Sequence, residues 1–103
     1  MFARTAFRVI DCSRPDTIAL VADLLKALGN RDRLRLSLTL LHEELCVSEL
    51  ERRLDLRQST LSQQLTVLRR HGLVITRRDG KRIFYRMDSG LAAKLLSALK
   101  AAD

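Results

Sequence analysis

Apolar residues recur at helical spacing over most of this sequence. Pro15 fits the first turn of a helix, and the apolar positions that follow keep a three-and-four spacing up to Leu28. Asn30, a good N-cap residue, precedes a second stretch of this kind that ends within residues 42–44. Residues 45–47 form a short apolar link. The pattern therefore predicts two successive helices in the first half of the chain.

Two short helices separated by a tight turn are predicted next. The segment Ser48–Glu51 matches the capping-box pattern and opens a helix that ends at Leu54. Residues 55–57 form the turn, and residues 58–71 form a helix with leucines at positions i, i+4 and i+7. Gly72 fits the end of that helix. Two short helices joined by three residues are typical of a helix-turn-helix.

The periodicity changes after this pair of helices. Leu73–Arg78 and Lys81–Met87 are short runs rich in β-branched and aromatic residues, which favour strands. Asp79-Gly80 joins them, and this dipeptide is typical of a tight hairpin turn. A last helix, capped by Asp88 or Ser89, carries a stripe of leucines. The pattern as a whole predicts a mainly α fold with a small β-hairpin, a winged helix-turn-helix.

Length and composition agree with one small globular domain. The chain has 103 residues, of which 47% are apolar and 30% charged. Residues 1–14 lack periodicity, and we expect them to form a mobile N-terminal arm ahead of one domain over residues 15–103. No apolar run approaches the roughly 18 residues that cross a membrane. The first residues also lack the pattern of a secretory signal, so we expect a cytoplasmic protein.

The positive charge is concentrated in one part of the chain. The formal net charge is +7. Residues 57–86, which we call the basic block, contain eight basic residues and one acidic residue, and the rest of the chain is neutral. A charge that merely kept the protein soluble would be spread more evenly. The basic block therefore predicts a surface that binds an anionic partner.

The residues in this block suit double-stranded DNA. Amides and hydroxyls on the outer face of the 58–71 helix suit base edges in the major groove, and the arginines beside them suit phosphates. The basic hairpin fits a wing that lies along the DNA backbone or minor groove. Arg57 cannot cap this helix, so we expect the cap to shift and Arg57 to bind a phosphate. The predicted DNA-binding residues are Arg57, Gln58, Ser59, Thr60, Ser62, Gln63, Thr66, Arg69, Arg70, Arg77, Arg78, Lys81 and Arg82.

Two other classes of function are alternatives to DNA binding. A winged-helix module that uses the basic block on an acidic protein is the main alternative. The polar side chains suited to base edges, lying beside the arginines, favour DNA over such a partner. No glycine-rich phosphate loop, acid pair or nucleophile with a base is recognisable, so we do not expect an enzyme.

Four segments resemble the ArsR/SmtB family of winged-helix repressors. They are LGNRDRLR at residues 28–35, ELCVSEL at residues 44–50, STLSQQLTVLR at residues 59–69, and the hairpin over residues 72–86. The recognition helix and wing are most similar to the sulfide- and redox-responsive branch of the family. The resemblance implies a homodimer joined by the first and last helices. It also implies a repressor that binds an inverted-repeat operator and releases it when an inducer binds.

The two cysteines depart from the known sensor patterns of this family. Cys46 occupies the family's metal-box segment, but Ser48 stands where arsenite-sensing members have a second thiol. The resemblance implies that Cys12, in the arm of one protomer, could reach Cys46 of the other. Such a pair suits arsenite, antimonite or a soft divalent metal ion, with Asp11 or Glu44 as a further ligand. Oxidation of the same pair, or a purely structural role for both cysteines, are the alternatives.

Overall fold

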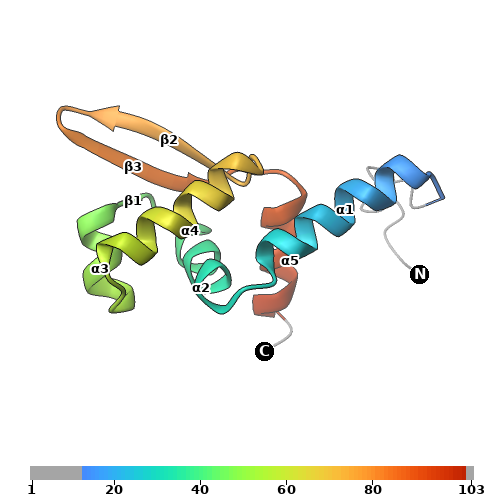
Figure 1. Cartoon of the computed structure of the whole chain (residues 1–103), viewed down its shortest axis with the longest axis horizontal. Coiled ribbons are helices and arrows are strands. Elements are labelled where there is room, and N and C mark those ends of the chain that lie inside the picture. Colours follow the sequence, from blue (N-terminus) through green and yellow to red (C-terminus); the bar gives the residue numbers. More distant parts are fainter. Residues whose placement is uncertain (1–12, 102–103) are drawn as a thin grey trace.

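The computed structural model describes residues 13–101, which form a winged helix-turn-helix with a small three-stranded sheet (Figure 1). This confirms the predicted fold class. The predicted N-terminal arm lies almost entirely outside the described residues. In chain order the elements are α1 (Pro15–Leu28), α2 (Arg31–Leu40), β1 (Leu45–Cys46), α3 (Val47–Leu54), α4 (Gln58–Arg70), β2 (Val74–Asp79), β3 (Arg82–Met87) and α5 (Leu91–Ala101).

Leucines supplied by every helix form a single core. The side chains of Leu36, Leu50, Leu61, Leu68 and Leu96 are fully buried. They come from α2, α3, α4 and α5 and pack together in one core. Leu61, Leu68 and Leu96 stand on the leucine stripes that the helical spacing predicts for α4 and α5. Helix α4 therefore rests on a continuous apolar base, which holds its outer face in a defined orientation.

The start of α3 differs from the predicted capping box at Ser48. Leu45 and Cys46 form strand β1, which pairs with β3, so the chain stays extended through Cys46 and the helix begins at Val47. Glu49 then reaches back, and its Oε1 accepts a hydrogen bond of 3.0 Å from the Cys46 N–H. The predicted apolar link is thus a strand, and the carboxylate that bonds back to the helix start is Glu49.

The hairpin turn is shifted by one residue from the predicted Asp79-Gly80. Asp79 pairs with Arg82 and closes the β2–β3 ladder, so Gly80 and Lys81 are the two turn residues. Gly80 has φ of 65°, which a glycine adopts without a steric cost. Glycine at the first central position is typical of a type II′ hairpin turn. Both basic residues at the tip, Lys81 and Arg82, are exposed.

Two helix ends also differ from the prediction. α2 ends at Leu40, a little before the predicted 42–44, because the chain then turns toward β1. α5 begins at Leu91, after the predicted caps. The N–H of Asp88 instead donates to the carbonyl of Leu73 over 3.0 Å, which ties the end of the hairpin to its beginning.

The molecule is elongated, with extents of 45 × 26 × 26 Å. The wing projects at one end and α1 extends from the other (Figure 1). In the part of the chain that the structure describes, no helix has the length and apolar character needed to span a membrane.

Candidate nucleic-acid interface

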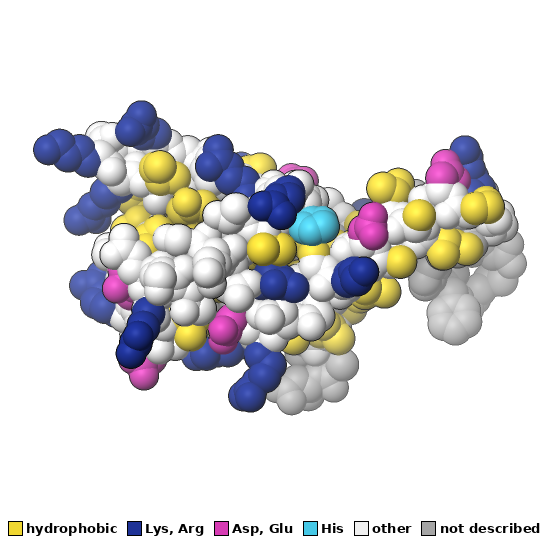
Figure 2. Space-filling view, viewed as in Figure 1, with side chains coloured by type: hydrophobic (Ala, Val, Ile, Leu, Met, Phe, Trp, Pro, Cys, Tyr) yellow, Lys and Arg dark blue, Asp and Glu magenta, His cyan; other side chains and the backbone are white. Residues whose placement is uncertain are grey.

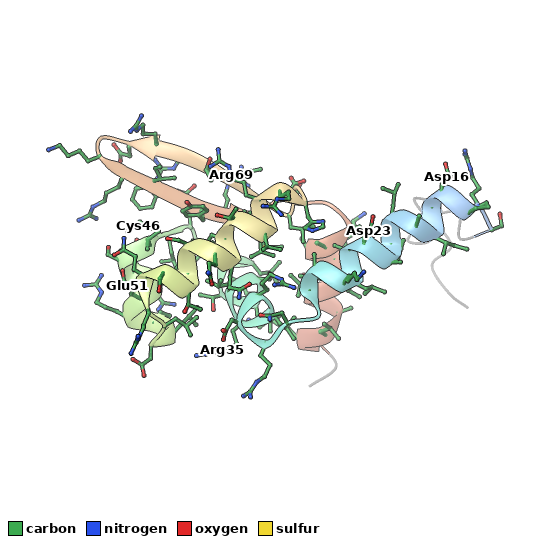
Figure 3. The ribbon with its side chains drawn as sticks, in the orientation of Figure 1. Asp16, Asp23, Arg35, Cys46, Glu51 and Arg69 are labelled. Carbon is green, nitrogen blue, oxygen red and sulfur yellow. The ribbon has the colours of Figure 1, made fainter. Side chains whose placement is uncertain are left out.

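The outer face of α4 is exposed and free of acidic residues. Its leucines point into the core, and Thr60 is half-buried. Arg69 lies toward the end of α4 that is nearer the wing (Figure 3). The predicted DNA-binding side chains of this segment that are exposed are Arg57, Gln58, Ser59, Ser62, Gln63, Thr66, Arg69 and Arg70. The structure thus brings most of the predicted contacts of this helix onto one accessible surface.

Arg57 takes the N-cap position of α4, so the expected shift of the cap does not occur. Its backbone carbonyl accepts the first helical bond, from Leu61 N–H at 3.0 Å, and no side chain caps the helix. The first N–H groups of a helix carry a partial positive charge that attracts anions. The exposed guanidinium of Arg57 adds a full charge at the same end, which suits a phosphate.

Arg33 is a structural residue that fixes the recognition helix, and the sequence reading missed it. Its Nη1 donates to Gln64 Oε1 on α4 over 2.9 Å, and its Nε donates to the carbonyl of Ala27 at the end of α1. The Asn30 side chain accepts a bond of 3.1 Å from the Arg33 N–H and caps α2, as predicted. Gln64 therefore serves the fold, in contrast to its exposed neighbour Gln63.

The wing carries its cations in two different settings. Arg78, Lys81 and Arg82 are exposed near the tip, and Figure 2 shows Lys and Arg side chains gathered around the hairpin. Arg77 is also exposed, but it is engaged with the protein: its Nε donates to Glu44 Oε1 over 2.7 Å, and its guanidinium lies 4.8 Å from the centre of the Phe84 ring. The predicted wing contacts are therefore not equivalent.

Glu44 is a further residue that the sequence reading did not connect with the wing. It precedes β1, and its second oxygen lies 3.9 Å from Arg86 Nε on β3. Glu44 and Arg77 are 33 positions apart, so no local pattern links them. The one available signal is that Glu44, an acid, directly precedes an apolar segment that can pair with the basic hairpin.

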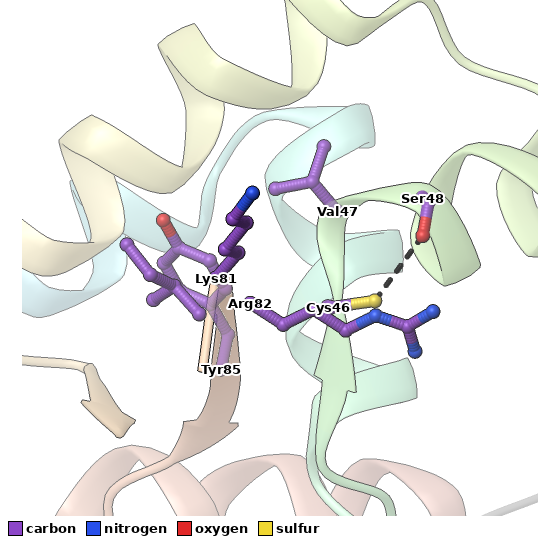
Figure 4. A pocket seen from close by; sticks show the side chains of 7 residues that line it. Cys46, Val47, Ser48, Lys81, Arg82 and Tyr85 are labelled. Atoms are coloured by element: carbon purple, nitrogen blue, oxygen red, sulfur yellow. Dashed lines mark hydrogen bonds between the residues drawn. The ribbon is translucent and has the colours of Figure 1, made fainter. Parts of the chain in front are cut away.

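Cys46 is buried where the sheet meets α3. It is 4% exposed, and its Sγ lies 3.2 Å from Ser48 Oγ. Figure 4 shows it at a hollow of about 270 Å³ between the start of α3 and the wing, which Lys81 and Arg82 also line. Cys12 lies outside the described residues, so its pairing with Cys46 stays a prediction. Within residues 13–101 no three His, Cys, Asp or Glu side chains gather as a metal site would require.

Hydrogen bonds lower the pKa of two carboxyl groups, Glu49 on α3 and Glu43 between α2 and β1. The N–H of Cys46, donating to Glu49, lowers the pKa of that carboxyl below its ordinary value of 4.5. A hydrogen bond from Arg53 lowers the pKa of Glu43 in the same way. Both carboxyl groups are therefore anionic at neutral pH.

An apolar surface on the first and last helices is left uncovered by the residues that the structure describes. Figure 2 shows hydrophobic side chains along α1, the helix that extends away from the wing. The large apolar residues of this surface are exposed by 50% or more: Ile18, Leu20, Leu25 and Leu99. Apolar side chains grouped on helices in this way are typical of a surface that another protein covers.

Comparison with known proteins agrees with this geometry. Residues 30–76 match the family of bacterial regulatory proteins of the arsR type. The chain is 56% identical over 81 residues to a biofilm growth-associated repressor of Agrobacterium fabrum, a match that covers 79% of this chain and 69% of that one.

Solved structures of similar proteins share the fold over nearly all of their length. HlyU from Vibrio cholerae superimposes with a TM-score of 0.83 at 40% identity, covering 86% of this chain and 97% of that one. The transcriptional repressor BigR from Xylella fastidiosa does so with a TM-score of 0.78 at 47% identity, covering 84% and 89%. These relatives are regulators of transcription and not enzymes. The chain therefore belongs to the ArsR family of bacterial DNA-binding transcriptional regulators.

Proposed function

We propose that this protein is a homodimeric repressor that binds an inverted-repeat operator through α4 and the wing. The observation that carries this proposal is the continuous exposed surface of amides, hydroxyls and arginines on α4, which packs against the first strand of a hairpin with a basic tip. The repressor activity is that named for the Agrobacterium relative. We expect the protein to act in the cytoplasm, where its DNA lies.

In this proposal the two parts of the surface have different tasks. Gln58, Ser59, Ser62, Gln63 and Thr66 read base edges in the major groove, because amides and hydroxyls can both donate and accept hydrogen bonds. The basic side chains position the protein on phosphates and carry no direct sequence information. Thr60 is half-buried, so its contribution is the smallest among the predicted residues of α4. The phosphate contacts are assigned to Arg57, Arg69, Arg70, Arg78, Lys81 and Arg82.

The test is DNA binding measured by fluorescence anisotropy, with the upstream region of the gene itself and a random duplex of equal length. We expect the upstream region to bind at least a hundredfold more tightly. Gln63→Ala should reduce this ratio by about tenfold, the effect of one good base contact, and leave the salt dependence unchanged. Arg31→Gln, an exposed arginine outside the basic block, is the control. Equal affinity for both duplexes would favour a module that binds an acidic protein.

The inducer is proposed to act through the thiols of Cys12 and Cys46. Cys46 supports this because it is the N-cap residue of α3, the helix before α4, and borders the wing residues Lys81 and Arg82. A change at its sulfur therefore has a short path to the DNA-binding surface. Two thiolates suit arsenite, antimonite or a soft divalent metal, and the same thiols could instead be oxidised to a disulfide.

Release of bound DNA distinguishes these inducers. The complex is titrated with arsenite, with a soft divalent metal ion and with hydrogen peroxide, and anisotropy is recorded for wild type, Cys12→Ser and Cys46→Ser. Loss of the response in both variants supports a paired-thiol sensor, and the reagent that acts identifies its chemistry. An unchanged response in both variants would assign the cysteines a structural role.

A further inference from the structure

Glu44 lies at the place where the wing joins the body of the protein. It directly precedes β1, and β1 is the two-residue strand that fastens the hairpin to the helices through β3. Both of its carboxylate oxygens face the wing: Oε1 accepts from Arg77 Nε at 2.7 Å, and Oε2 lies 3.9 Å from Arg86 Nε. One acid thus reaches an arginine on each of the two wing strands.

Arg77 is held on several sides at once. Besides Glu44, it contacts the ring of Phe84 at 4.8 Å and lies 3.9 Å from the carboxylate of Asp79. Phe84 pairs with Arg77 on one side and with Cys46 of β1 on the other, so these three residues form a row across the sheet. An isolated exposed ion pair contributes little, but a charge that also rests on an aromatic ring and faces two acids is better fixed.

We propose that Glu44 is a positioning residue for the wing, which holds Arg77 against β1 as an anchor and keeps it from neutralising a DNA phosphate. This inference rests on the proposed DNA-binding surface and gives the arginines of the wing two different roles. Arg78, Lys81 and Arg82 at the tip make the phosphate contacts, and Arg77 sets the angle at which the tip meets the DNA.

The arrangement affects specificity because β1 provides few bonds to hold the hairpin. A wing released from Glu44 could pivot, and its freed arginine could pair with any phosphate regardless of sequence. Loss of the carboxylate is therefore expected to raise non-specific affinity and to lower discrimination between operator and random DNA. A residue that served stability alone would not change the number of phosphates that the protein neutralises.

The experiment measures the affinity for a random duplex as a function of salt. Each phosphate neutralised by the protein contributes about −0.9 to the slope of log affinity against log salt. Glu44→Gln should make the slope steeper by about this amount, so that affinity falls roughly twofold more between 0.1 and 0.2 M salt than in wild type. Glu43→Gln is the matched control: it removes the same charge one position away, from a carboxylate paired with Arg53 on α3.

Two arginine variants complete the test. Arg77→Gln should leave the wild-type slope unchanged, whereas Arg78→Gln, its exposed neighbour, should reduce it by about one phosphate. The double variant Glu44→Gln/Arg77→Gln should restore the wild-type slope. Equal slopes for Glu44→Gln and Glu43→Gln, or an equal reduction by Arg77→Gln and Arg78→Gln, would overturn the proposal while leaving DNA binding intact. Failure of the wild type to bind any duplex would instead reject the proposed function.

Discussion

Ser37 is the polar side chain that lies deepest in the described part of the protein. It is fully buried on α2, and its hydroxyl has no hydrogen-bond partner. An unsatisfied buried hydroxyl costs about 1–3 kcal/mol, because the bond it made with water in the unfolded chain is not replaced. Alanine fits the same space and lacks that hydroxyl.

Ser37→Ala is therefore expected to raise the free energy of unfolding by about 1 kcal/mol or more. Urea denaturation followed by circular dichroism measures the change. Alanine is also the better helix former, so Ser62→Ala, an exposed position within α4, is the control for propensity. A gain no larger than that of the control would mean that the Ser37 hydroxyl is satisfied in solution.

At the scale of single residues, contacts between residues far apart in the sequence could not be predicted. Core leucines such as Leu61 and Leu65 are predictable, because helical spacing is a local property of the chain. The Arg33–Gln64 bond joins residues 31 positions apart, and neither residue carries a local mark of its partner. The bond between Arg77 and Glu44 spans 33 positions and is equally invisible to a local pattern.

At the scale of elements, the prediction failed where two local rules competed. Ser48 and Cys46 each stand three residues before a glutamate, and the pattern alone favours serine as the cap. The helix begins at Val47 because Cys46 pairs with Phe84, and this strand pairing keeps the chain extended through Cys46. The partner of β1 is distant in the sequence, so the local pattern predicts only an apolar link at residues 45–47.

The hairpin turn provides the prediction at this scale. Gly80 has a positive φ of 65°, which costs an L-residue with a Cβ roughly 1–2 kcal/mol. Gly80→Ala should lower the free energy of unfolding by about that amount, and Gly80→Asn by less, because asparagine tolerates this conformation better. Open space surrounds the position, so backbone strain is the cause tested. Equal stability of the glycine and alanine proteins in urea would contradict the assigned turn.

At the scale of the whole molecule, the proposed DNA-binding surface and the apolar surface lie at different places on an elongated body. The wing projects at one end, and α1, with its exposed apolar side chains, extends from the other (Figure 1). A second copy related by two-fold symmetry could cover the apolar surface of α1 and α5 and leave both recognition helices free. The two helices would then face the two halves of an inverted repeat.

This arrangement predicts that dimerisation and DNA contact can be separated by mutation. Leu25→Gln combined with Leu99→Gln should reduce the mass in sedimentation equilibrium from twice 11.7 kDa to 11.7 kDa, because each change places an amide in the apolar interface. The variant should bind a full inverted repeat no more tightly than a single half-site. Ile83→Gln, an exposed apolar position on the wing, is the control and should remain dimeric. A wild-type protein that sediments at 11.7 kDa at micromolar concentration would rule out the dimer.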